Sequence, residues 1–207
     1  MIVLYDYWRS SAAYRVRIAL NHLGLDYRAV PVDLLTGAHR MPDNVARNPQ
    51  GLVPTLEIDG LSLTQSLAIL EYLHETRGGL LPEDPGGRAR VRAIAYAIAM
   101  EIAPVANLTV RNRVADLAEG RIRADDWQRE VIVRGFAAVE MMLDPPLTGP
   151  YCHGNMVSTA DLCLIPQVYN AERMDVTMTD YPAIMAVATA LRALPAVIRA
   201  HPDAVRP

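Results

Sequence analysis

Two adjacent serines, Ser10 and Ser11, are the first residues of the chain that could do chemistry. They lie between a short apolar run and a stretch with helical spacing, and no cysteine, histidine or acid stands directly beside them. A helix N-terminus presents free N–H groups and partial positive charge, so it favours an anion. Either a serine only caps the helix, or the hydroxyls donate hydrogen bonds to a ligand's thiolate, whose usual pKa of about 8.5 a helix N-terminus lowers.

Two dipeptides further along the chain carry binding signals. Pro54 stands directly before a predicted strand, where proline removes a backbone donor. A cis Val53–Pro54 bond would turn the chain there and leave the Val53 backbone facing outward. Gln65 and Ser66 precede a second predicted helix, and Ser66 either caps it or binds a ligand carboxylate through its hydroxyl and N–H.

A βαβ unit is predicted to position the serines. Residues 1–7 are β-like, residues 16–23 carry apolar side chains at helical spacing before Gly24, and residues 25–34 indicate a second strand. Residues 55–63 predict a hairpin that turns at Asp59–Gly60. Residues 66–79 predict a helix that ends at a pair of glycines.

Prolines and glycines in residues 80–88 predict a linker between two domains. We therefore expect an α/β domain over residues 1–80 and an all-helical domain of five or six helices over residues 88–207. Within the second domain, Ser158 and Asp161 have the spacing of a capping box. We predict a structural role for this pair, with a catalytic Asp161 as the minor alternative.

Composition excludes several classes of protein. Of 207 residues, 51% are hydrophobic and 21% are charged, which predicts a folded core, and the net charge of -3 disfavours nucleic acid as a partner. All 20 basic residues are arginines, which excludes a Schiff-base lysine and a P-loop lysine. Cys152 and Cys163 fit no zinc or redox spacing. No metal, no signal peptide and no membrane span are expected, and we predict a soluble cytoplasmic protein.

Several segments together resemble the zeta class of the glutathione S-transferase superfamily, which includes the maleylacetoacetate isomerases. They are SSAAYRVRIAL (10–20), NPQGLVPTLEIDG (48–60), TQSLAILEYL (64–73), LLPEDP (80–85) and ADLCLIPQVYNAERM (160–174). The resemblance covers about residues 2–200. It implies a thioredoxin-like N-terminal domain, an all-helical C-terminal domain, a cis Val53–Pro54 bond, a homodimer, and glutathione as the thiol.

The resemblance also implies roles for individual residues. Ser10 would hydrogen-bond the glutathione sulfur with Ser11 beside it, and Arg173 would hold a substrate carboxylate. The resemblance assigns no residue to the developing enolate charge; Arg9 could stabilise that charge or could equally lie on the surface. The other residues implied to bind glutathione are Arg15 in the serine motif, His39 near the glycyl end, Val53 and Pro54 at the cysteinyl part, Gln65 and Ser66 at the γ-glutamyl end, and Asn107 and Thr109 in the cleft.

The implied reaction is the cis–trans isomerisation of maleylacetoacetate to fumarylacetoacetate in tyrosine and phenylalanine catabolism. Ala12 replaces a cysteine common in the family, and Ala103 stands where relatives often carry Gln or His, so the substrate stays open. The alternatives are a maleylpyruvate isomerase, a glutathione transferase or dehalogenase acting on small α-halo acids, and a non-catalytic glutathione-binding protein. The last of these is disfavoured by the retention of four residues: Ser10, Gln65, Ser66 and Arg173.

Overall fold

A computed structural model describes residues 1–143 and 145–207, which form two compact units. The first unit contains residues 1–80 together with residues 193–207, and the second contains residues 81–192. Residues 193–207 were predicted to belong to the helical domain. They belong instead to the first unit. Helix α9 (Pro195–Ala200) packs against α1 (Ser11–His22) of the first unit, where Val197 and Ala200 are buried.

A four-stranded sheet forms the base of the first unit. Its strands are β1 (Ile2–Asp6), β2 (Tyr27–Pro31), β3 (Thr55–Ile58) and β4 (Leu61–Thr64), in the spatial order β2–β1–β3–β4. β1 and β2 are parallel, whereas β1 and β3, and β3 and β4, are antiparallel. This mixed order, with the βαβ unit first and a hairpin last, confirms the predicted thioredoxin-like domain.

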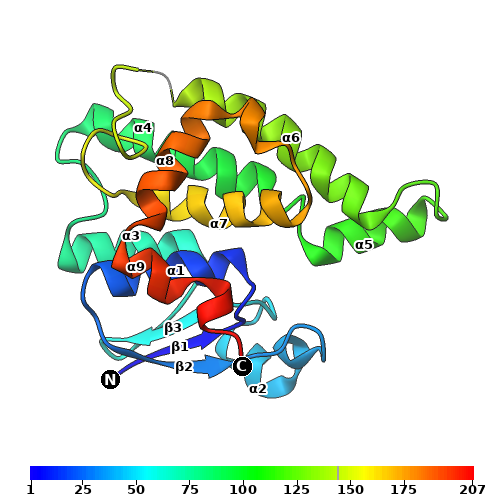
Figure 1. Cartoon of the computed structure of the whole chain (residues 1–207). Helices are drawn as coiled ribbons and strands as arrows, with labels where there is room; N and C mark the ends of the chain where they lie inside the picture. The colour runs from blue at the N-terminus through cyan, green and yellow to red at the C-terminus, as the bar shows by residue number, and fades with distance from the viewer. Residues whose placement is uncertain (144) are drawn as a thin grey trace. The chain divides into compact units, whose positions relative to one another are not determined.

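The β3–β4 hairpin turns at the predicted residues. Asp59 has φ 53° and Gly60 has φ 79°, the left-handed pair that a tight two-residue hairpin turn requires. Helix α1 and α3 (Ser66–Arg77) pack against each other, and Figure 1 shows α1, α3 and α9 on one side of the sheet. The short helix α2 (Pro42–Arg47) and two 3₁₀ turns, η1 (Ala38–Arg40) and η4 (Pro202–Ala204), complete this unit.

The second unit is helical, as predicted. It contains α4 (Pro85–Tyr96), a π-helical segment η2 (Ala97–Ile102), α5 (Leu108–Leu117), α6 (Ala124–Met142), α7 (Thr159–Arg173), η3 (Met178–Asp180) and α8 (Pro182–Arg192). Helix α7 is its centre, because α7 packs against α4, η2 and α8 and buries most of its length. Gly135 lets α6 approach η2 closely, since a Cβ there would overlap Ile102. None of the described helices is long and apolar enough to cross a membrane.

The predicted capping box begins α7. The backbone N–H and the hydroxyl of Ser158 donate to Asp161 Oδ2 at 2.8 and 2.7 Å. The N–H of Cys152 donates to the other carboxylate oxygen at 2.8 Å. Both capping residues are fully buried, and burial raises the pKa of Asp161 against the opposing effect of these donors. These three hydrogen bonds hold the helix start in place, in keeping with the predicted structural role.

Candidate active site

The sheet register brings most of the predicted site residues of the first unit to one end of the sheet. Tyr5 lies opposite Thr55, and Thr55 lies opposite Thr64. The segment that follows β1, the segment that precedes β3 and the segment that follows β4 therefore leave the sheet at the same end. These segments contain Ser10, Val53–Pro54 and Gln65–Ser66.

Ser10 is the N-cap of α1. Its hydroxyl oxygen accepts from the Ala13 N–H at 3.3 Å, and its own N–H donates to the Tyr7 carbonyl at 2.8 Å, which closes a turn. A hydroxyl has one donor and two acceptor lone pairs, so capping leaves the Ser10 O–H able to donate elsewhere. The two interpretations of this serine are therefore compatible. Ser11 is the half-buried first residue of the helix.

Arg15 and Ser66 join α1 to the start of α3. Arg15 is 3% exposed, and its Nη1 donates to the Ser66 hydroxyl oxygen at 3.1 Å. Its Nε and Nη2 have no hydrogen-bond partner among the described residues. Unpaired N–H groups on a buried cation are costly. A ligand carboxylate at this point would satisfy them through the charge-assisted bonds that arginine makes best.

Gln65 directly precedes α3 in an unusual backbone conformation. It has φ 66° and ψ 111°, and its Nε2 donates to Gln50 Oε1 at 2.6 Å. A non-glycine residue held in such a region costs about 1–3 kcal/mol, and strain of this kind concentrates at functional sites. The first turn of α3 contains no acidic residue, so its positive end is not neutralised by a side chain of that turn.

The Val53–Pro54 bond is cis, as predicted. Val53 is half-buried, and its N–H and C=O form no backbone hydrogen bond with the described residues. The preceding loop is held by two buried side chains, because the amides of Asn44 and Asn48 donate to the Leu52 carbonyl at 3.5 and 3.0 Å. Neither asparagine was predicted as a site residue, although they are four positions apart, with Asn44 in α2 and Asn48 at its C-cap.

His39 lies in η1, on the connection from β2 to α2. Its Nδ1 is buried without a hydrogen-bond partner among the described residues. Burial, helped by the adjacent Arg40 charge, lowers the pKa of His39. The imidazole is therefore neutral near pH 7 and can act as a hydrogen-bond donor or acceptor rather than as a cation.

Arg9 lies inside the turn before Ser10. Its guanidinium carbon is 5.3 Å from the centroid of the Trp8 ring, within the range of a cation–π contact. Arg206 makes the same type of contact with Trp8 at 5.1 Å. Arg9 is half-buried, so both a structural role and a role toward a ligand are open to it.

Three predicted residues lie in the second unit. Asn107 is the N-cap of α5, where its side-chain oxygen accepts from the Val110 N–H at 2.9 Å, and Thr109 is exposed in the first turn of the same helix. Arg173 is the exposed last residue of α7, and its guanidinium lies 5.8 Å from the ring centroid of Tyr169.

The thiols of the chain itself are poorly suited to act as nucleophiles. Cys152 and Cys163 are fully buried, and neither forms a disulfide among the described residues. Burial raises the pKa of Cys152 well above its usual value, and the carboxylate of Asp161 adds to this effect. A reactive thiolate is therefore better supplied by a ligand. Within residues 1–143 and 145–207, no cluster of His, Cys, Asp and Glu is arranged to hold a metal ion.

These features fit glutathione, a tripeptide with one thiol, two carboxylates and peptide groups between them. The capped start of α1 suits the thiolate, and the unpaired N–H groups of Arg15 with the start of α3 suit a carboxylate. The free backbone groups of Val53 can pair with a peptide.

Comparison with known proteins agrees with this fit. Residues 1–75 match the family described as the N-terminal domain of glutathione S-transferase. The chain is 57% identical over 208 aligned residues to the maleylacetoacetate isomerase of Rhizobium meliloti (strain 1021), and the alignment covers 99% of this chain and 98% of the relative.

Solved structures are similar over the full chain. A holo maleylpyruvate isomerase, a bacterial zeta-class glutathione S-transferase, superposes with a TM-score of 0.94 at 38% identity, covering 99% of this chain and 98% of the other. The maleylacetoacetate isomerase of Methylobacterium extorquens AM1, with bound malonate and glutathione, gives 0.92 at 41% identity, with 98% and 97% covered. The chain belongs to the zeta class of glutathione S-transferases, the maleylacetoacetate isomerase family.

Proposed function

We propose that the protein catalyses the glutathione-dependent cis–trans isomerisation of maleylacetoacetate to fumarylacetoacetate. The observation that carries this proposal is the combination of two groups in the first unit: the start of α1 at Ser10, which suits a thiolate, and the buried Arg15, two of whose nitrogens have no partner among the described residues. The cysteines of the chain are buried, so a ligand is the better source of the thiolate. Identity of 57% to a maleylacetoacetate isomerase over the whole chain supports this substrate.

Glutathione, when bound, supplies a thiolate that adds to the conjugated cis double bond, allows rotation about the resulting single bond, and then leaves. The Ser10 hydroxyl donates to the sulfur, and the free N–H groups at the start of α1 add their positive end. Each unit by which these donors lower the thiol pKa corresponds to about 1.4 kcal/mol of preference for the thiolate. Ser11 lies beside Ser10 and is a second candidate donor.

The other proposed residues hold the rest of glutathione. Arg15, Ser66 and Gln65 bind the γ-glutamyl end, where the two free nitrogens of Arg15 meet the carboxylate. Val53, placed by cis-Pro54, pairs its backbone with the cysteinyl residue, and the neutral His39 lies toward the glycyl end. Asn107 and Thr109 are proposed as further glutathione-binding residues, as the resemblance implies.

Two arginines are proposed to act on the substrate. Arg173 binds a substrate carboxylate, because an exposed guanidinium can make a bidentate contact with it. Arg9 lies next to Ser10 in the same turn and is proposed to stabilise the negative charge that develops on the substrate carbonyl oxygen. Ala12 is compatible with this mechanism, since the reacting sulfur comes from glutathione.

Maleylpyruvate is the second candidate substrate. The supporting observation is the TM-score of 0.94 with a maleylpyruvate isomerase. Both substrates have a cis double bond conjugated to a carbonyl, with carboxylates that an arginine can bind. The higher sequence identity to a maleylacetoacetate isomerase favours the larger substrate.

The deciding experiment measures initial rates with maleylacetoacetate, maleylpyruvate and a small α-halo acid, each with and without glutathione. We expect the highest kcat/KM with maleylacetoacetate and no turnover when glutathione is omitted. Faster turnover of maleylpyruvate would change the substrate assignment. Turnover of only the halo acid would make the protein a transferase or dehalogenase, and glutathione binding without any turnover would make it a binding protein.

We also propose that the protein is a homodimer, as the resemblance to the zeta class implies, and that it works in the cytoplasm. Neither cysteine forms a disulfide among the described residues, which is in keeping with a reducing compartment. Light scattering at micromolar concentration tests the assembly, and a monomeric mass would contradict it.

A further inference from the structure

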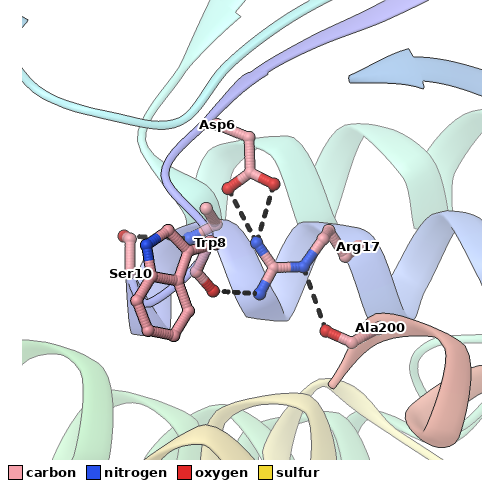
Figure 2. Close-up of polar contacts among 6 residues, drawn as sticks. Asp6, Trp8, Ser10, Arg17 and Ala200 are labelled. Carbon is pink, nitrogen blue, oxygen red and sulfur yellow. Dashed lines mark hydrogen bonds and ion pairs between the residues drawn. The ribbon is translucent and has the colours of Figure 1, made fainter. Parts of the chain in front are cut away.

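Arg17 lies at the junction of three segments of the first unit, and none of the site assignments above uses it. Its side chain is 1% exposed, so the guanidinium is withdrawn from solvent. Nη1 donates to both carboxylate oxygens of Asp6 at 2.7 Å, Nη2 donates to the Trp8 carbonyl at 2.9 Å, and Nε donates to the Ala200 carbonyl at 3.0 Å (Figure 2). One planar group therefore connects the end of β1, the turn before α1 and the end of α9.

The orientation of the Trp8 carbonyl determines the geometry of the turn that leads into Ser10. The turn runs from Tyr7 to Ser10 and is closed by the Ser10 N–H donating to the Tyr7 carbonyl at 2.8 Å. Trp8 is its first central residue, so its carbonyl belongs to the peptide plane in the middle of the turn. The bond from Arg17 fixes the orientation of that plane. The next peptides of the chain lead directly into Ser10.

Asp6 and Ala200 hold Arg17 itself. Asp6 is 5% exposed, and its carboxylate compensates the charge of the guanidinium, which could not otherwise be buried at low cost. The carbonyl of the fully buried Ala200 accepts from Arg17 Nε and so fixes the other edge of the guanidinium group. Arginine can satisfy these separate acceptors because its N–H donors have a rigid, planar arrangement, whereas lysine offers a single nitrogen.

We propose that Arg17 is a positioning residue for Ser10: by fixing the Trp8 carbonyl against Asp6 and the end of α9, it sets where the Ser10 hydroxyl points. This inference rests on the proposed function for its catalytic consequence. Arg17 does not contact the sulfur or the substrate in this account, and it acts through the turn.

The test compares two matched double variants. Asp6→Asn with Arg17→Gln removes both buried charges together, so neither is left unpaired, and it breaks the planar connection. Asp59→Asn with Arg77→Gln is the control, because Arg77 Nη2 donates to both oxygens of Asp59 at 2.9 and 2.8 Å on the surface of the same unit. Arg17→Lys, which keeps the charge opposite Asp6, is a third variant in case the first double variant folds poorly.

Two readouts separate positioning from general stability. In the absence of glutathione, we expect amide hydrogen exchange in residues 7–13 to become about tenfold faster in the Arg17 variants and to stay unchanged in the control. In the pH–rate profile, we expect the apparent thiol pKa to move up toward that of free glutathione. With maleylacetoacetate, kcat should fall about tenfold while KM for glutathione changes little, since a small misplacement is costly in a preorganised site.

The inference is overturned if the folded Arg17 variants keep wild-type exchange in residues 7–13 and a wild-type pH–rate profile, or if the control changes equally. A failure of the proposed function is distinct from this. It would appear as a wild-type protein without glutathione-dependent turnover, and the exchange measurement would still test the positioning role.

Discussion

Arg15 and Ser66 are 51 residues apart in the sequence and are joined by a buried hydrogen bond of 3.1 Å between the guanidinium and the hydroxyl. This bond links the helix that carries Ser10 to the helix proposed to bind the γ-glutamyl end of glutathione. It leaves two buried N–H-bearing nitrogens of Arg15 without a partner among the described residues. These two nitrogens are the groups that we propose to bind a ligand carboxylate, because arginine forms charge-assisted hydrogen bonds with carboxylates.

Replacing Arg15 tests that site. We expect Arg15→Met to weaken glutathione binding about ten- to 150-fold, the equivalent of one lost charge-assisted interaction. The free energy of unfolding of the ligand-free protein should stay equal or rise, because the change removes a poorly satisfied buried charge. Calorimetric titration and urea unfolding measure the two effects, with the exposed Arg28→Met as the control. Loss of stability with unchanged affinity would indicate a purely structural arginine.

Ser10 variants separate capping from catalysis. Ser10→Ala removes the cap and the donor, so it should cost about 0.5–2 kcal/mol of stability. It should also lower kcat about ten- to 150-fold and move the pH–rate profile to higher pH. Ser10→Gly costs only a few tenths of a kcal/mol as a cap, yet it lacks the hydroxyl, and it should show the same kinetic loss. Full activity of Ser10→Gly would assign the hydroxyl a capping role only.

Ser11→Ala should be milder than Ser10→Ala, because Ser10 is the capping residue. Parallel measurement of kcat and of KM for glutathione gives the comparison. An inactive Ser11→Ala beside a fully active Ser10→Ala would mean that the other hydroxyl contacts the sulfur.

Thiol reagents test the source of the reacting sulfur. Because Cys152 and Cys163 are fully buried, we expect no measurable reaction of the native protein with DTNB over minutes and two thiols after unfolding in urea. Treatment with an alkylating agent, followed by its removal, should leave isomerase activity unchanged. Rapid labelling accompanied by inactivation would show that a cysteine of the chain takes part.

Asp161 provides a pH test of the capping box. Burial raises its folded-state pKa above the ordinary value of 3.8, so the fold favours the protonated carboxyl. Its contribution to stability is therefore fully present below pH 3.8 and is lost as the pH rises through the folded-state pKa. The stability difference between wild type and Asp161→Asn should shrink as the pH rises through this range. Urea unfolding at a series of pH values gives the difference, and an increase with pH would contradict the sign.

The sequence alone determined several local structures. The Asp59–Gly60 turn, the Ser10 position before α1 and the Ser158–Asp161 capping box depend on residues within a few positions of each other, so local spacing encodes them. The segments at the end of the sheet were also predicted as binding segments. Their residues carry recognisable types, such as proline before a strand and serine before a helix.

Only the tertiary structure decided which distant groups meet. The last helix was predicted in the helical domain, yet α9 packs on α1, because its apolar residues indicate a buried face but do not specify the partner. The bond from Arg17 to Ala200 spans 183 residues, and that from Arg15 to Ser66 spans 51. No local pattern predicts that these two arginines are buried, and their partners come from other elements. The acceptors that satisfy a buried charge are set by packing across the whole unit, which no local pattern specifies.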